Sequence, residues 1–158
     1  MDLRQLIEEL SELWGTHAAE TATVERRGWT VSIDQSASQL LFAVKASPTH
    51  NVLISHETQI TRTLDEMGIS EEAKLGDPEF DSRYVVRNLS DQDAAELFNP
   101  EVLDLLRKLE PFTELELAST GYRLLKHVRL GEDYDATRAS ADIDALVDLV
   151  EKTSRQRV

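Results

Sequence analysis

The feature that most constrains the fold is a change in the spacing of apolar residues along the chain. At both ends, from Asp2 to Trp14 and from Tyr134 to Ser154, apolar residues recur at the spacing of an amphipathic helix. Between these ends, short runs alternate apolar and polar residues, which is the pattern of a strand with one buried face. The change of period predicts an α+β domain with an amphipathic helix at each end.

Six runs carry a strand pattern, and turn residues such as Asp34–Ser38 and Ser47–Asn51 separate them. The predicted strands are Val24–Ile33, Leu40–Ala46, Val52–Ile54, Arg83–Arg87, Phe112–Ala118 and Tyr122–Leu130. The first of them contains Gly28, a residue that often marks a break in a strand. Connections between the first three strands are too short for a parallel crossover, so we expect an antiparallel meander.

The last two strands form a predicted hairpin around the turn at residues 119–121. Glutamates at Glu114 and Glu116 on one strand oppose Arg123 and Arg129 on the other, which favours one register of the pair. On the second strand of the hairpin, alternation assigns Lys126 to the face that also carries Tyr122, Leu124 and Val128.

Further helices are predicted between the strands. One runs from about His56 to Met67, and Ile69–Pro78 is expected to form a loop. Ser90 is a predicted N-cap, and Asn99 followed by Pro100 begins the next helix. We therefore expect a single domain over residues 1–158, with an antiparallel sheet of about six strands and helices packed on it.

The composition restricts the classes of partner. The formal net charge is −13, whereas nucleic-acid-binding domains are normally basic because they neutralise phosphates. An anionic membrane surface would repel the same charge. We expect no nucleic-acid partner and no direct membrane insertion. The charge fits a basic protein partner or simple solubility.

The sequence contains no cysteine, which excludes disulfides, thiolate catalysis and cysteine-based metal sites. Residues Met1–Gln5 lack the basic start and following apolar run of a signal peptide. No stretch approaches the roughly 18 apolar residues that a membrane-spanning helix needs. These observations predict a soluble protein of the cytoplasm.

One local group of side chains could bind a ligand. Asp77, Glu79, Asp81 and Arg83 flank Phe80 just before a predicted strand. Carboxylates on a loop at a sheet edge can bind a divalent cation or act as general acid and base. The alternative is structural: Asp77–Pro78 forms a turn, Phe80 enters the core, and Asp81 pairs with Arg83 or caps a backbone N–H.

Other chemical motifs are weak or missing. The four histidines, His17, His50, His56 and His127, match no helical ligand spacing, so we predict no metal site. No glycine-rich phosphate loop, dinucleotide fingerprint or nucleophile elbow occurs, so we predict no cofactor and no catalytic residue. Arg26 and Arg27 beside Trp29 could stack a ligand, or could guard a strand edge.

The run from Gly76 to Arg87, followed by an acidic helix and Asn99–Pro100, resembles a signature of uncharacterised bacterial proteins. In these a Gly-Asp-Pro-x-Phe-Asp motif leads into a strand that begins with Arg and an aromatic residue. The resemblance implies a bacterial origin and brings no activity with it. The order of elements is also similar to that of type III secretion chaperones, with an insertion over Arg83–Leu109. That likeness is one of topology, which does not determine function.

These observations favour a non-enzymatic, bacterial protein-binding or interaction domain. The Leu-rich faces of the end helices cover the sheet in a monomer, whereas in a homodimer part of that surface, including Trp14, would form an isologous interface. The first alternative is an enzyme or a small-ligand or metal sensor with its site near Asp77–Arg83. The second is a soluble module of a membrane-associated assembly.

Overall fold

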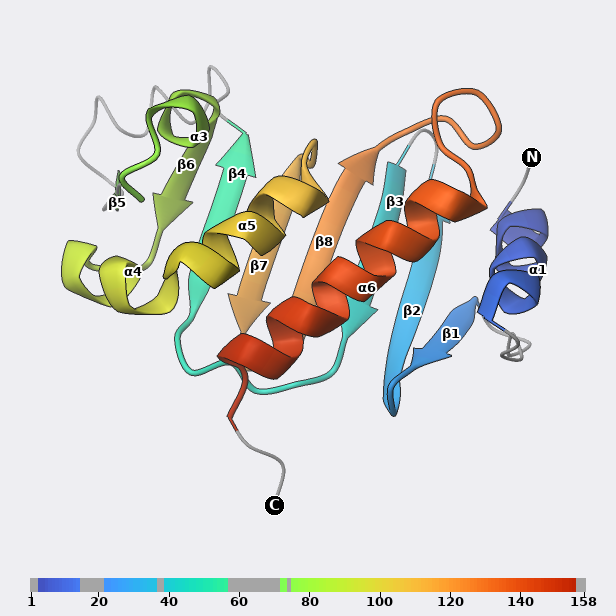
Figure 1. Ribbon diagram of the computed structural model, residues 1–158, viewed down its shortest axis with the longest axis horizontal. Helices are drawn as coiled ribbons and strands as arrows, with labels where there is room; N and C mark the ends of the chain where they lie inside the picture. Colours follow the sequence, from blue (N-terminus) through green and yellow to red (C-terminus); the bar gives the residue numbers. More distant parts are fainter. Residues whose placement is uncertain (1–2, 15–21, 37–38, 57–71, 74, 156–158) are drawn as a thin grey trace.

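The computed structural model describes residues 3–14, 22–36, 39–56, 72–73 and 75–155 (Figure 1). The strands are β1 (Thr23–Arg26), β2 (Trp29–Ser36), β3 (Gln39–Val44), β4 (Val52–His56), β5 (Glu72–Ala73), β6 (Tyr84–Arg87), β7 (Glu114–Ala118) and β8 (Gly121–His127). The helices are α1 (Leu3–Trp14), α3 (Pro78–Arg83), α4 (Asp91–Leu97), α5 (Pro100–Leu109) and α6 (Ala136–Thr153).

The strands form one antiparallel sheet in the order β1-β2-β3-β8-β7-β4-β6-β5. The α+β class and the antiparallel sheet are thus confirmed, and the described residues form eight strands instead of about six. One extra strand arises because Arg27 and Gly28 take φ angles of 51° and 80°. Two consecutive residues with positive φ make the tight turn of a hairpin. The run predicted as one strand, Val24–Ile33, therefore forms parts of two paired strands, β1 and β2. The other extra strand is the two-residue β5.

The expected meander holds for β1, β2 and β3 but is wrong for β4. The hairpin of β7 and β8 lies between β3 and β4, pairing with β3 through β8 and with β4 through β7. The connection from β3 to β4 therefore passes two strands at one end of the sheet (Figure 1). Backbone hydrogen bonds hold this connection to the end of α6, since Thr49 N–H donates to the Thr153 carbonyl and Arg155 N–H to that of Ser47.

The helices α5 and α6 lie side by side across one face of the sheet, and α1 packs against α6 near β1 (Figure 1). The core lies between these helices and the sheet. Alternate strand residues point into it, and the fully buried side chains include Ile33, Phe42, Ile54, Leu115, Tyr122 and Leu124. The strand residues between these buried ones point to the opposite face of the sheet. In Figure 1, no helix of the described part of the chain lies across that face.

Two of the predicted caps begin helices as expected. The Ser90 hydroxyl accepts a hydrogen bond from the Asp93 N–H, and the Asn99 side chain accepts one from the Val102 N–H. The predicted strand at Arg83 begins one residue later, because Arg83 is the last residue of α3.

A helix and a loop were expected in the middle of the chain, between β4 and α3. The helix expected from His56 to Met67 lies outside the described residues, except that His56 ends β4. The loop expected over Ile69–Pro78 is in part wrong, because Glu72 and Ala73 pair with β6 and Pro78 begins α3.

Candidate functional site

The sequence singled out four residues around Phe80, and the structure gives the first a double role. The Asp77 carboxylate caps α3, accepting hydrogen bonds from the N–H groups of Glu79 and Phe80. It also accepts from the Arg107 guanidinium at 2.6 and 3.1 Å. The hydrogen bond from Arg107, with that from the Phe80 N–H, lowers the pKa of Asp77.

The other charged residues of this group turn to different partners. The Asp81 carboxylate accepts hydrogen bonds from the N–H groups of Leu75 and Gly76, which closes the turn before α3. Arg83 donates to both carboxylate oxygens of Glu110, at 2.8 and 3.1 Å. The structural alternative from the sequence was that Asp81 caps a backbone N–H or pairs with Arg83. Asp81 does cap backbone N–H groups, whereas the partner of Arg83 is Glu110.

The burial of Phe80 accounts for the arrangement of residues 77–83. Its ring is 1% exposed and stacks on Tyr84 at a centroid distance of 4.7 Å, while Tyr84 stacks on Phe112 at 4.5 Å. Helix α3 presents Phe80 to this aromatic stack, and Asp77 and Asp81 fix both ends of the turn that leads into it. A ligand role for the four charged residues stays a prediction.

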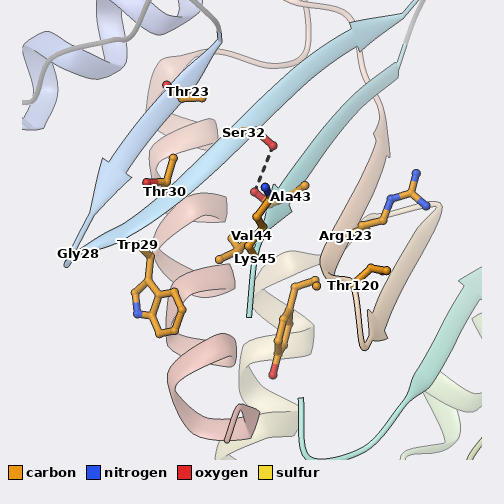
Figure 2. Close-up of a pocket in the computed structure, with 12 residues that line it drawn as sticks. Thr23, Gly28, Trp29, Thr30, Ser32, Ala43, Val44, Lys45, Thr120 and Arg123 are labelled. Carbon is orange, nitrogen blue, oxygen red and sulfur yellow. Dashed lines mark hydrogen bonds between the residues drawn. The ribbon is translucent and has the colours of Figure 1, made fainter. Parts of the chain in front are cut away.

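A concavity of about 690 Å³ lies elsewhere, over the β1, β2, β3 and β8 strands (Figure 2). Its lining residues are Thr23, Gly28, Trp29, Thr30, Ser32, Ala43, Val44, Lys45, Thr120, Gly121, Tyr122 and Arg123. Strand register aligns Thr23, Ser32, Ala43 and Arg123 in one row across four strands. Their strand neighbours Val24 and Val31 are buried in the core, as are the lining residues Val44 and Tyr122. The row of four, though not every lining residue, therefore belongs to the opposite face of the sheet.

The charge of this concavity differs from that of the chain. Among its lining residues the only charged groups are two cations, Lys45 and Arg123, in a chain of net charge −13. Four lining residues, Thr23, Thr30, Ser32 and Thr120, add hydroxyl groups that can donate or accept. No local sequence motif marks this site, because its residues come from four strands and the turns beside them.

Arg26 and Arg27, which the sequence places beside Trp29, both have acidic partners on α6. Arg26 Nε lies 2.7 Å from Asp144 Oδ1, and Arg27 Nη2 lies 2.6 Å from Asp148 Oδ1. Both guanidinium groups thus pair with carboxylates of α6, which ties the β1–β2 hairpin to the helical layer.

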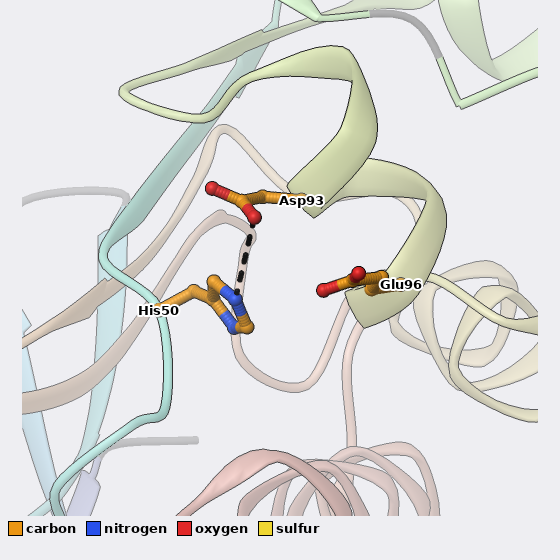
Figure 3. A group of neighbouring side chains, drawn as sticks. All are labelled: His50, Asp93 and Glu96. Atoms are coloured by element: carbon orange, nitrogen blue, oxygen red, sulfur yellow. Dashed lines mark ion pairs between the residues drawn. The ribbon is translucent and has the colours of Figure 1, made fainter.

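A second group of potential ligands comes from His50, Asp93 and Glu96 (Figure 3). One ligand atom from each of the three side chains lies within 4.8 Å of the others. His50 belongs to the connection between β3 and β4, and the two carboxylates are three residues apart on α4. No spacing in the sequence revealed this group, because His50 and Asp93 are far apart along the chain.

Comparisons of the chain with protein-family models, with curated proteins and with solved structures each gave no match. The resemblances of Gly76–Arg87 and of the element order therefore stay predictions. None of the helices in the described part of the chain combines the length and apolar character that crossing a bilayer requires.

Proposed function

We propose that this chain is a non-enzymatic binding domain of the bacterial cytoplasm, whose partner is a protein. The site would be the sheet face opposite the helices, centred on the concavity, and the bound element an extended, acidic segment. The single observation that carries this proposal is a concavity with only cationic charges in a strongly acidic chain. The bacterial origin rests on the resemblance of Gly76–Arg87, and the location on the acidic, cysteine-free sequence.

Arg123 is the side chain best placed to receive a carboxylate. Its Nη1 atom lies 3.7 Å from Glu116 Oε1, which is a long ion pair, and half of the side chain is exposed. A guanidinium can bind an incoming carboxylate through two parallel hydrogen bonds, which is a stronger arrangement than this pair. Lys45 adds a second exposed positive charge at the end of β3.

The acidic charge of the whole chain does not oppose this choice. At physiological ionic strength the Debye length is about 8 Å, so exposed charges beyond that distance are largely screened. The charged residues that line the concavity are both positive. A carboxylate nearby is that of Glu116, which an incoming carboxylate would displace from its long ion pair with Arg123. The net charge of the whole chain, taken alone, favours a basic partner. The positive charges of Lys45 and Arg123 in the concavity favour a partner segment that carries carboxylates.

The surface beside the concavity favours a protein segment over a small molecule. Leu41, Leu53 and Leu125 lie on the same sheet face and are each only partly buried. Small-molecule sites usually enclose most of the ligand surface, whereas protein interfaces cover about 800 Å² on each partner. A concavity that continues onto partly exposed leucines suits the larger interface.

Charge reversal at the concavity tests the proposal. The double variant Lys45→Glu and Arg123→Glu should lose at least about nine-tenths of the partner recovered by the wild type in quantitative affinity capture, since each like-charge contact is unfavourable. Lys108→Glu is the control for reversing one charge outside the concavity, because Lys108 is an exposed cation on α5, in the helical layer. The captured partner is then purified, and its acidic segment is synthesised and titrated by calorimetry.

Two results would contradict the proposal. In one, the captured protein binds the double variant as tightly as it binds the wild type and the Lys108→Glu variant. In the other, the synthetic acidic segment fails to compete with the whole partner. If the partner recovered is a second copy of this chain, measured as a dimer that the double variant cannot form, the homodimer predicted from sequence would replace a foreign partner.

A further inference from the structure

We propose that His50, Asp93 and Glu96 bind one divalent transition-metal ion such as Zn²⁺. This site goes beyond the proposed function and uses none of the residues that line the concavity. Its basis is geometric, because an imidazole nitrogen and two carboxylate oxygens come within 4.8 Å of one another (Figure 3). Convergence of one nitrogen and two oxygen ligands is the donor set of many sites that hold such an ion.

Both segments that supply the ligands are held in place by the fold. Thr49, next to His50, donates its backbone N–H to the Thr153 carbonyl at 2.9 Å. Helix α4 begins at the Ser90 cap, and its Ala94 and Leu97 side chains are buried. The ligand atoms therefore project from anchored backbone, which lowers the cost of ordering them around an ion.

The second nitrogen of His50 supplies an independent indication. Its Nδ1 atom lies 3.0 Å from the Thr49 hydroxyl oxygen, while Nε2 faces Asp93 Oδ1 at 3.9 Å. Histidines that bind metals commonly use one ring nitrogen for the ion and hold the other in a hydrogen bond, which orients the ring. Thr49 is thus a positioning residue that aims Nε2 at the carboxylates.

Charge and distance both suit a small divalent ion. Helix α4 carries the carboxylates Asp91, Asp93 and Glu96 and no basic residue. Bonds of about 2 Å to a tetrahedral ion place its ligand atoms about 3.3 Å apart. The three ligand atoms lie within 4.8 Å of one another, so they need to close by at most about 1.5 Å. Rotation of the exposed Glu96 side chain can supply most of this movement. The imidazole favours Zn²⁺ over Mg²⁺ and Ca²⁺, which prefer all-oxygen sites.

Calorimetric titration of the full chain with Zn²⁺, Mg²⁺ and Ca²⁺ tests the site. We expect one Zn²⁺ per chain, with binding that His50→Gln and Glu96→Gln each weaken by at least about tenfold. Thr49→Val should weaken Zn²⁺ binding by about tenfold while every ligand remains. His127→Gln is the matched control, since His127 is an exposed histidine at the end of β8, and it should leave binding unchanged.

Ring nitrogen resonances of His50, followed by NMR during the same titration, give a readout that does not depend on stability. Zn²⁺ should shift Nε2 of His50 and leave the His127 ring unaffected. The proposal is overturned if His50→Gln binds Zn²⁺ as tightly as the wild type, if no Zn²⁺ binds, or if Mg²⁺ and Ca²⁺ bind equally well. The last outcome would indicate diffuse attraction to the acidic surface.

Discussion

At the scale of single residues, the least expected feature of the core is a buried ion pair. Lys126 is 1% exposed, and its Nζ atom lies 2.8 Å from Asp142 Oδ2 in an ion pair. The Tyr134 hydroxyl donates to the same oxygen at 2.5 Å. Burial lowers the pKa of Lys126, and the nearby Asp142 carboxylate partly offsets that effect. The pair joins β8 to α6 beneath the helical layer.

Substituting one partner of this pair should cost more than replacing both. Asp142→Asn leaves the Lys126 ammonium group buried without its carboxylate, and should lower the free energy of unfolding by about 3 kcal/mol or more. In Lys126→Met with Asp142→Leu no buried charge remains, so the loss should be smaller. Urea denaturation at neutral pH measures both. If both variants lose the same free energy of unfolding, an unpaired buried charge on Lys126 is not the cause of the loss.

Tyr122 gives a pH-dependent prediction. Its hydroxyl shares a 2.7 Å hydrogen bond with Thr153, and burial raises the pKa of Tyr122 to about 12 although this hydrogen bond opposes the shift. A tyrosine whose pKa is raised by folding stabilises the fold fully below pH 10, and that contribution is lost as the pH rises through 12. The stability advantage of wild type over Tyr122→Phe should therefore fall by about 2 kcal/mol from pH 10 to pH 12. Urea denaturation along this pH range checks the fall, and parallel curves for the two proteins would contradict it.

At the scale of elements, the start of β8 depends on the absence of a side chain. A Cβ atom on Gly121 would lie 2.5 Å from the backbone oxygen of Val44, and Gly121 has a φ of +136°. Gly121→Ala should therefore destabilise the protein by about 3 kcal/mol, because the strand backbone of β3 cannot move aside. Gly76→Ala is the matched control, since Gly76 has a φ of +82° with no atom within 4 Å. It should cost only about 1 kcal/mol. Thermal denaturation of both variants tests the difference, and equal losses would contradict the close contact.

The elements that could be predicted from the sequence are those in which a local pattern of residues decides the local structure. The caps Ser90 and Asn99 follow from spacing within one element, and both are confirmed. Alternation along β8 assigned Lys126 to the face of Tyr122 and Leu124 without predicting that its charge would be buried. Helix α3 was missed because it has only six residues, too few to show a helical period. Three features depend on which distant segments of the chain meet: the strand order, the concavity and the group around His50. The spacing of residues within one segment cannot predict such contacts.

At the scale of the molecule, the sheet order interleaves the two halves of the chain. The hairpin β7–β8 comes late in the sequence but occupies the centre of the sheet, between β3 and β4. Helix α6 then packs against both α1 and α5, which come from opposite halves (Figure 1). Neither half can build a continuous sheet or a closed core without the other.

This interleaving predicts that the domain unfolds as one unit. Calorimetry should show a single transition whose calorimetric and van't Hoff enthalpies agree, with an unfolding enthalpy of about 110 kcal/mol near 60 °C from the average per residue. A chain ending at Leu109 lacks β7, β8 and α6, which leaves β3 and β4 without their central partners. That shortened chain should show no cooperative transition, and its buried leucines should bind a hydrophobic dye instead. Two resolved transitions in the whole chain, or cooperative unfolding of the shortened one, would show that the halves fold independently.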